Sequence, residues 1–376
     1  MWNIFMTKKK SENDLHLFVA GTRGIPDILG GVETHCENLY PRIAREGVSV
    51  TLARRSAYVA ETNRIQEYQG VDLVDIYSPH TKSLEAIVHT FFSVLYAWRR
   101  KFNFVHIHAI GPSLVIPFAR LLGLKVVMTH HGSDYERQKW GRLATLSLRL
   151  GEWCAAKFSN EIIVISETIN TLLRGKYHRN DAHLIANGVV FPDVADGDDY
   201  IRGLGLEPCR YIIAVGRFVP EKGFHDLLDC ASEIDSQYKV VLVGDADHRT
   251  EYSEQLKKDA QSKGIVLTGF IRGRELNQIF THAALFVMPS YHEGLPIALL
   301  EALSYNLRVV VSDIPANAEV GLDESNYFAV GNGGQLSARI NEQLSNDSVV
   351  DHHDWLTKKY NWDTIAEQTL SVYRRL

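Results

Sequence analysis

The sequence predicts an α/β protein of two Rossmann-like domains, each built on a parallel sheet, with the two sheets facing a central cleft. Short apolar runs alternate with helical runs along the whole chain, which is typical of parallel sheets covered by helices on both faces. The length of 376 residues exceeds what a single hydrophobic core usually supports. A turn-rich, acidic stretch near the middle separates two such series of runs, so we expect two domains joined there.

The expected strands are short runs of apolar residues. In the first half they lie near residues 15–20, 48–53, 71–76, 104–108, 125–129, 161–165 and 183–186. In the second half they lie near residues 211–216, 239–243, 265–268, 284–288 and 308–311. The predicted units are a first domain over 1–188, a linker over 189–209, a second domain over 210–358 and a final helix over 359–376 that packs back on the first domain.

The most informative segment is Ser290–Leu303, which holds two carboxylates, Glu293 and Glu301. A buried strand is expected before it, and a helix is expected from Pro296 because proline is favoured at a helix start. Glu293 then lies in the strand-to-helix loop and Glu301 lies inside the helix. The free N–H groups and positive dipole end of that helix favour an anionic group. The segment therefore predicts a long polar ligand with a phosphate near its middle.

A second candidate loop follows the apolar run that starts at Tyr211. Arg217 and Lys222 bracket this loop at the carboxyl end of an expected strand, where open α/β sheets bind ligands. Two cations held there can neutralise the charge that develops on a departing diphosphate.

Two further loops follow strands of the first domain. Gly30 and Gly31 stand at the start of a helical run that reaches Glu46, and the missing Cβ lets the backbone approach a phosphate or sugar closely. The run from Lys125 ends in a polar loop that contains His131. A G-x-G-x-x-G pattern is absent from the sequence, which argues against a dinucleotide cofactor.

Taken together, these motifs resemble glycosyltransferase family 4, which comprises retaining enzymes of the GT-B fold that use sugar nucleotides. The resemblance implies that Glu293 holds hydroxyls of the transferred sugar and that Glu301 accepts hydrogen bonds from the ribose. It assigns the diphosphate to Arg217 and Lys222. It also implies contacts to the sugar or nucleotide from Gly30, Gly31, His131, Ile271, Gly294 and Leu295. The strings Gly21–Pro26 and Thr129–Trp140 resemble the rhamnosyltransferase-like branch of bacterial surface-polysaccharide glycosyltransferases.

No cofactor or metal is expected. Asp245 and Asp247 form a D-x-D sequence of the kind that binds Mn²⁺ in the other major transferase fold, but the resemblance expects a metal-free turn here. Arg217 and Lys222 already supply the positive charge that a metal would bring. We therefore predict full activity in a chelator.

Charge and composition indicate where the protein works. The net charge is −5, with a basic first half and an acidic second half, so an anionic lipid-linked acceptor suits the first domain. Four cysteines are scattered without C-x-x-C spacing, which favours a reducing cytoplasm. The first residues are not expected to form a signal peptide, and apolar runs are too short to span a bilayer. The runs over 82–101 and 137–157 combine aromatic and basic residues and are candidates for peripheral contact with the inner membrane.

The resemblance implies transfer of a hexose, with retention, from a UDP- or GDP-sugar to a glycan or lipid-linked acceptor. It places the reaction in lipopolysaccharide O-antigen, capsule or exopolysaccharide synthesis, and it implies no nucleic-acid partner. Two alternatives stay open. One is a sugar-nucleotide epimerase or hydrolase of the same fold, which needs no acceptor. The other is a non-catalytic subunit that partners an active transferase.

Overall fold

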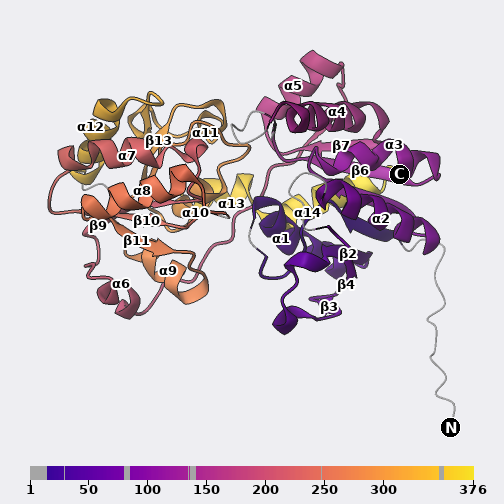
Figure 1. Ribbon diagram of the computed structural model, residues 1–376, viewed down its shortest axis with the longest axis horizontal. Coiled ribbons are helices and arrows are strands. Elements are labelled where there is room, and N and C mark those ends of the chain that lie inside the picture. Colours follow the sequence, from indigo (N-terminus) through magenta and orange to yellow (C-terminus); the bar gives the residue numbers. More distant parts are fainter. Residues whose placement is uncertain are drawn as a thin grey trace, which may run out of the picture.

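The computed structural model describes residues 15–28, 30–79, 85–133, 135, 141–246, 248–346 and 351–376. These residues form two lobes, each with its own sheet, as the sequence predicts (Figure 1). The last helix, drawn in yellow, lies with the N-terminal lobe although the chain reaches it from the C-terminal lobe.

The N-terminal domain is built on an eight-stranded sheet of order β3-β4-β2-β1-β5-β6-β7-β8. Its neighbouring strands are parallel except for the antiparallel pair β3–β4. The strands are β1 (His16–Ala20), β2 (Ser49–Arg55), β3 (Glu67–Tyr68), β4 (Val71–Ile76), β5 (Phe104–His108), β6 (Lys125–His130), β7 (Glu161–Val164) and β8 (His183–Leu184). The helices are α1 (Gly31–Arg45), α2 (Glu85–Arg99), α3 (Ile116–Leu121), α4 (Arg142–Phe158) and α5 (Glu167–Tyr177).

The C-terminal domain is built on a six-stranded parallel sheet of order β11-β10-β9-β12-β13-β14. Its strands are β9 (Tyr211–Val215), β10 (Lys239–Val243), β11 (Val266–Gly269), β12 (Leu285–Met288), β13 (Arg308–Ser312) and β14 (Tyr327–Phe328). Its helices are α6 (Asp199–Gly203), α7 (Phe224–Cys230), α8 (Glu251–Ser262), α9 (Gly273–Thr281), α10 (Ile297–Ser304), α11 (Pro315–Ala318), α12 (Gly333–Leu344) and α13 (His353–Lys359). Single 3₁₀ turns occur at η1 (Ser56–Tyr58), η2 (Glu61–Asn63), η3 (Pro112–Val115), η5 (Pro220–Lys222), η6 (Ala231–Glu233) and η7 (Glu324–Asn326).

The central strands bury apolar residues on both of their faces because both faces of each sheet are covered. In β1, Phe18 and Ala20 pack into one core, and Leu17 and Val19 pack into the core on the opposite face. Phe18 is in register with Thr51 of β2 and is thereby fixed at the middle of the sheet. This double burial explains why continuous apolar runs, rather than alternating ones, predict these strands.

The final helix α14 (Trp362–Tyr373) crosses back and packs against α1. A Cβ at Gly188 would overlap the ring of Trp362, so the absence of a side chain there lets the indole approach the backbone. On the surface, Arg42 of α1 pairs with Asp363 at 2.9 Å. The C-terminus is therefore part of the N-terminal core.

Three details differ from the prediction. The two-residue strands β3 and β14 were not predicted, because two residues carry no periodicity. Strand β2 runs on to Arg55, beyond the predicted end at residue 53, because Arg54 is buried and pairs with Asp75 at 2.7 Å. Two consecutive arginines predict a loop when only the sequence is considered. In the fold, the neighbouring strand β4 supplies the carboxylate that compensates the charge of Arg54.

Candidate functional site

The carboxyl ends of both sheets meet between the domains, and each sheet reverses its strand order there. In the N-terminal sheet the reversal lies between β1 and β5, and in the C-terminal sheet it lies between β9 and β12. Ligands of open α/β sheets bind in the crevice at such a switch point. The predicted loop residues Arg217 and Glu293 follow β9 and β12 respectively, so the topology brings together two motifs that are far apart in the chain.

Lys222 and Glu293 form an ion pair at this point. The Lys222 ammonium lies 2.6 Å from Oε1 of Glu293, and Ser290 Oγ donates to the same oxygen at 2.7 Å. The side chains of Lys222 and Glu293 are 18% and 10% exposed, so the pair is held largely out of water. Gly223 makes this turn possible, because it adopts φ 66 and a Cβ there would overlap the carbonyl oxygen of Pro289.

Arg217 lies in the same loop after β9 as Lys222. Its neighbour Gly216 has φ 159, and a Cβ on Gly216 would lie 3.5 Å from Cδ and Cε of Lys222. Ile271 is further away, since it follows β11 at the edge of the sheet and β10 lies between β11 and β9. The two predicted cations thus share the loop that follows β9, and Ile271 follows β11, two strands away.

Glu301 lies in α10, the helix that begins just after Pro296, in agreement with the predicted loop and helix positions of the two glutamates. Burial raises the pKa of the Glu301 carboxyl to about 7. A buried carboxylate of this kind favours a ligand that donates hydrogen bonds to it, because such bonds to its charged form would offset the loss of its hydration. Gly294 and Leu295 precede the helix, and Leu295 is buried.

The N-terminal domain presents its glycines and His131 to this loop. A Cβ on Gly294 would overlap the carbonyl oxygen of His131, and the Cα of Gly132 would lie 3.5 Å from it. A Cβ on Gly31 would lie 3.5 Å from Cδ1 of Ile297, the first residue of α10. The predicted residues of both domains therefore meet across a narrow gap, and small residues on both sides permit the approach.

Glu33 is a buried carboxylate that holds the glycine loop in place. Its Oε1 accepts hydrogen bonds from Thr22 Oγ1 at 3.1 Å and from the backbone N–H of Arg23 at 2.8 Å. A Cβ at Gly30 would overlap its other oxygen, Oε2. The glycine at position 30 is thus required by Glu33 as well as by the helix start, which sequence reasoning did not anticipate.

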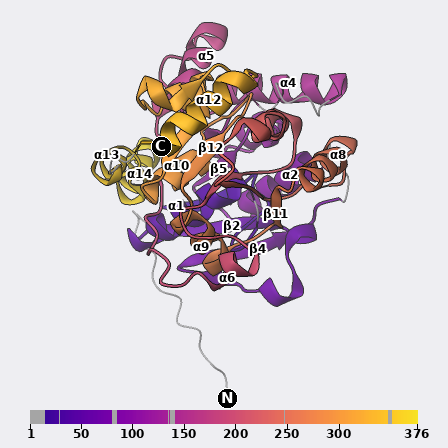
Figure 2. The same ribbon diagram turned by 90° about the vertical axis from the view of Figure 1, so that its left-hand side faces the viewer.

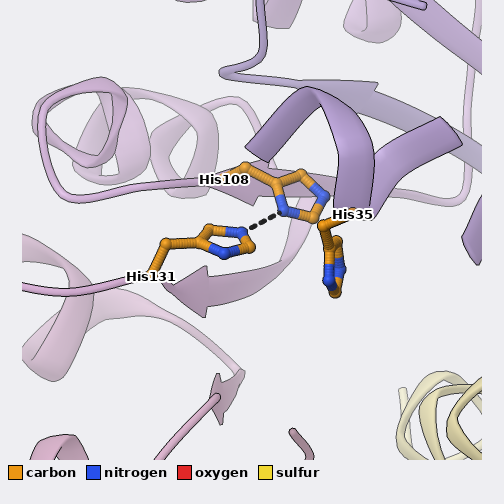
Figure 3. A group of neighbouring side chains, drawn as sticks. All are labelled: His35, His108 and His131. Carbon is orange, nitrogen blue, oxygen red and sulfur yellow. Dashed lines mark hydrogen bonds between the residues drawn. The ribbon is translucent and has the colours of Figure 1, made fainter. Parts of the chain in front are cut away.

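Three histidines cluster beside this gap (Figure 3). One ring nitrogen from each of His35, His108 and His131 lies within 4.8 Å of the other two, and His108 Nδ1 is 2.9 Å from His131 Nε2. Asn187 Oδ1 lies 2.6 Å from His35 Nδ1. Burial lowers the pKa of His35 to about 4 and those of His108 and His131 well below the ordinary range, so all three rings are neutral. Sequence reasoning found only His131, although His106-x-His108 at a strand end was an available signal.

Among the described residues, this trio is the group that could hold a metal ion. Neutral imidazoles are good ligands for zinc. Here, however, the two nitrogens of His108 and His131 that face each other are already joined by a hydrogen bond. As for the D-x-D sequence, Asp245 pairs with Lys257 at 2.6 Å, and Asp247 lies outside the described residues.

Comparisons with known proteins agree with this fold. Residues 29–190 match the family described as Glycosyltransferase Family 4, and residues 199–362 match the family described as Glycosyl transferases group 1. Sucrose-phosphate synthase from Thermosynechococcus elongatus superposes with a TM-score of 0.82 at 18% identity, covering 96% of this chain and 98% of that one. HepE from Anabaena, solved with UDP and glucose, superposes with a TM-score of 0.78 at 18% identity, covering 96% and 99%.

A phosphatidylinositol N-acetylglucosaminyltransferase subunit of Saccharomyces cerevisiae is 23% identical over 385 residues, which span 93% of this chain and 80% of that protein. The fold and the family matches define a glycosyltransferase of the GT-B type, with two Rossmann-like domains whose sheets face each other. The two matched segments take up most of the chain, and the chain belongs to the family 4-like glycosyltransferases.

Proposed function

We propose that this protein transfers a hexose, with retention of configuration, from a UDP- or GDP-sugar to a glycan or lipid-linked acceptor. In this proposal it needs no metal and works at the cytoplasmic face of the membrane, in the synthesis of lipopolysaccharide O-antigen, capsule or exopolysaccharide. It would belong to the rhamnosyltransferase-like branch. HepE supports the nucleotide class, since its structure contains UDP and glucose.

The observation that carries the proposal is the Lys222–Glu293 pair at the switch point of the C-terminal sheet. The two charges lie 2.6 Å apart and neutralise each other. When the donor binds, its diphosphate would take the ammonium of Lys222, and hydroxyls of the sugar would donate to Glu293. The exchange leaves the ammonium of Lys222 ion-paired with the diphosphate and the Glu293 carboxylate hydrogen-bonded by hydroxyls, so each buried charge keeps polar partners. Arg217 would share the diphosphate with Lys222.

Retention is proposed from the resemblance to family 4, and the hydrogen bonding of the nearby carboxylates is compatible with it. Glu33 is engaged by Thr22 and the Arg23 N–H, whereas Glu293 accepts from Ser290 and would accept from hydroxyls of the bound sugar, so neither is well placed as a nucleophile. We infer that the acceptor hydroxyl attacks the anomeric carbon on the face that the diphosphate leaves. The new C–O bond forms as the bond to the phosphate oxygen breaks, and that oxygen takes the hydroxyl proton.

The test of the donor site is a thermal-shift panel of UDP, GDP, ADP, CDP and dTDP in EDTA, on wild type and on Glu301→Ala. A nucleotide at 100 times its Kd adds about 2.7 kcal/mol of stability, which raises Tm by several degrees in a domain of this size. We expect one nucleotide to shift wild type and not Glu301→Ala. Glu367→Ala, which changes an exposed glutamate on α14, is the matched control and should respond like wild type.

A shift by none of the nucleotides would reject the donor-site proposal and favour a non-catalytic subunit. Isomerised or hydrolysed sugar in the absence of any acceptor would instead favour an epimerase or hydrolase.

We further propose that the outer face of α4 binds an anionic lipid surface. Leu143, Leu146, Leu150 and Trp153 are 85%, 64%, 49% and 41% exposed, and their spacing places them in one stripe along the helix. Figure 2 shows α4 at the outside of the molecule. The described helices include none long and apolar enough to cross a bilayer, so such contact would be peripheral.

Charge decides between a membrane and a second copy of the chain. The exposed side chains of α4 include Arg142, Arg149 and Lys157, whereas its acidic residue, Glu152, is buried and paired with Lys176 at 2.7 Å. Two copies meeting at this face would bring like charges together, whereas an anionic bilayer attracts each cation by about 1 kcal/mol. The predicted run over 82–101 is less suited, because α2 buries one face, including His89 and Val94, against its own domain.

Vesicle co-sedimentation tests the lipid surface. We expect binding to phosphatidylcholine vesicles that contain phosphatidylglycerol, weaker binding at high salt, and loss of binding in Leu146→Ser/Leu150→Ser. Leu184→Ser removes a leucine that is 48% exposed on β8 and should bind like wild type. Equal binding of both variants, or a dimer in light scattering that the double variant dissociates, would refute the proposal.

A further inference from the structure

A chain of hydrogen bonds runs from His131 into the interior of the N-terminal domain. His131 Nε2 is 2.9 Å from His108 Nδ1, the contact drawn in Figure 3. His108 Nε2 is 2.5 Å from the hydroxyl of Tyr40, and that hydroxyl is 3.0 Å from His106 Nδ1. His108, Tyr40 and His106 are fully buried, so water cannot substitute for a missing partner.

The far end of the chain is anchored by two hydroxyl groups. The hydroxyl of Tyr373 lies 2.6 Å from His106 Nδ1, and Thr129 Oγ1 lies 2.7 Å from His106 Nε2. Tyr373 is the last residue of α14, the helix that returns from the C-terminal domain. The network therefore links α1, β5 and β6 of the N-terminal domain to the last residue of α14.

Burial keeps every ring in this network in its neutral form. It lowers the pKa values of His106, His108 and His131 and raises those of Tyr40 and Tyr373. A neutral imidazole donates through one nitrogen and accepts through the other. Within each ring, the direction of the hydrogen bond at one nitrogen therefore fixes its direction at the other nitrogen.

The distances favour one arrangement of donors, in which His106 carries its proton on Nε2 and donates it to Thr129 Oγ1. His106 Nδ1 has a single lone pair and two hydroxyl neighbours, of which Tyr373 is the nearer, at 2.6 Å against 3.0 Å for Tyr40. If Tyr373 donates to that lone pair, Tyr40 is free to donate to its own nearer neighbour, His108 Nε2. His108 then carries its proton on Nδ1 and donates it to His131 Nε2.

We propose that Tyr40 and His108 are positioning residues that hold His131 as the Nδ1–H tautomer, so that its ring offers an N–H donor to an oxygen of the bound sugar. The donor role rests on the proposed function, whereas the tautomer itself does not. A sugar oxygen that accepts this hydrogen bond would be oriented without any charged group. Such a contact costs little reorganisation, because the ring is already aligned by its buried partners.

The same geometry argues against His131 as a metal ligand. A metal on His108 Nδ1 or on His131 Nε2 would break the 2.9 Å bond between them. His35 is the third member of the cluster, and its Nδ1 faces an acceptor, Asn187 Oδ1. Its other nitrogen is buried without a hydrogen-bond partner among the described residues, so His35 is outside the chain of donors.

The direct test is nitrogen NMR of the full-length protein labelled with ¹⁵N-histidine, which reports which ring nitrogen carries the proton. We expect His131 in wild type to be protonated on Nδ1, and Tyr40→Phe to give a mixture of both tautomers. His131→Gln identifies the signals. An Nε2–H tautomer of His131 in wild type would overturn the proposal, as would a stoichiometric bound metal in the purified protein.

Kinetics provide the second test. His108→Leu removes the donor to His131, and we expect turnover to fall by about 10²-fold, the order seen when one aligned donor is lost. His108→Asn places an amide N–H near the position of Nδ1 and should recover most of this loss. Nucleotide binding should be unchanged in both variants, because the nucleotide contacts lie in the C-terminal domain.

Wild-type turnover in His108→Leu would refute the positioning role. If no nucleotide binds even to wild type, the proposed function fails, while the tautomer measured by NMR still decides the hydrogen-bond direction.

Discussion

Replacing Glu301 by glutamine should stabilise the protein at alkaline pH and leave its stability at acid pH nearly unchanged. Burial raises the pKa of this carboxyl from 4.5 to about 7 in the folded protein. The folded state therefore holds the proton more tightly than the unfolded state does, and ionising Glu301 opposes folding. This penalty is absent below about pH 4.5, grows as pH rises towards 7, and is fully present above it. Glutamine has no charge to bury and so escapes the penalty.

The magnitude follows from the size of the shift. One pKa unit corresponds to about 1.4 kcal/mol, so the full shift corresponds to about 3 kcal/mol as an upper bound. The Glu301 side chain keeps some contact with solvent, and screening reduces the effect to about 1–2 kcal/mol. A change of that size raises Tm by about 2–8 °C in a domain of this size.

The assay is thermal unfolding of wild type, Glu301→Gln and Glu367→Gln at pH 5 and pH 8.5. Glu367 is exposed on α14, so its substitution should change stability by less than about 0.5 kcal/mol at either pH. Glu301→Gln should gain Tm over wild type at pH 8.5 and should weaken nucleotide binding in the same preparation. An equal gain in Tm at both pH values, or a lower Tm than wild type at pH 8.5, would show that burial of the ionised carboxylate does not destabilise the folded protein.

Three further predictions address the chemistry and the approach of the two domains. Lys222→Ala should lower turnover, because it removes a few kcal/mol of transition-state stabilisation, and should also lower Tm, because it leaves Glu293 buried without its cation. The double variant Lys222→Ala/Glu293→Gln should recover Tm but not turnover. Near-normal turnover in Lys222→Ala would remove Lys222 from the mechanism. Gly294→Ala places a Cβ against the carbonyl oxygen of His131, so turnover should fall. Nucleotide affinity, measured by calorimetry, should stay within about threefold of wild type. Unchanged turnover would show that the two domains are further apart during catalysis than in this structure. The turnover rate in EDTA should equal the rate without a chelator. A fall in the rate in EDTA that added Mn²⁺ reverses would establish a metal requirement.

Local patterns were sufficient to place the predicted loops but not to show which of them meet. Glu293 and Lys222 were each predicted from their own strand-to-loop segment, yet their contact depends on β9 and β12 being neighbours in the sheet. The histidine network was missed for the same reason. His106 and His108 are two residues apart, and this spacing places them on one face of a strand. Tyr40 and Tyr373 come from α1 and α14, and no pattern in the neighbouring sequence indicates their role.

What the sequence by itself determined is the alternation of strands and helices, the position of the turn at each strand end, and the residue types that those turns carry. These are local properties, set by periodicity, proline and glycine preferences and the burial of apolar runs. Only the tertiary structure decided that Gly294 faces His131, that Glu33 requires a glycine at position 30, and that Tyr373 closes a hydrogen-bond chain begun at His131. Such pairings depend on strand order and on the return of α14, and they depend on distances in space that neighbouring residues in the chain do not encode.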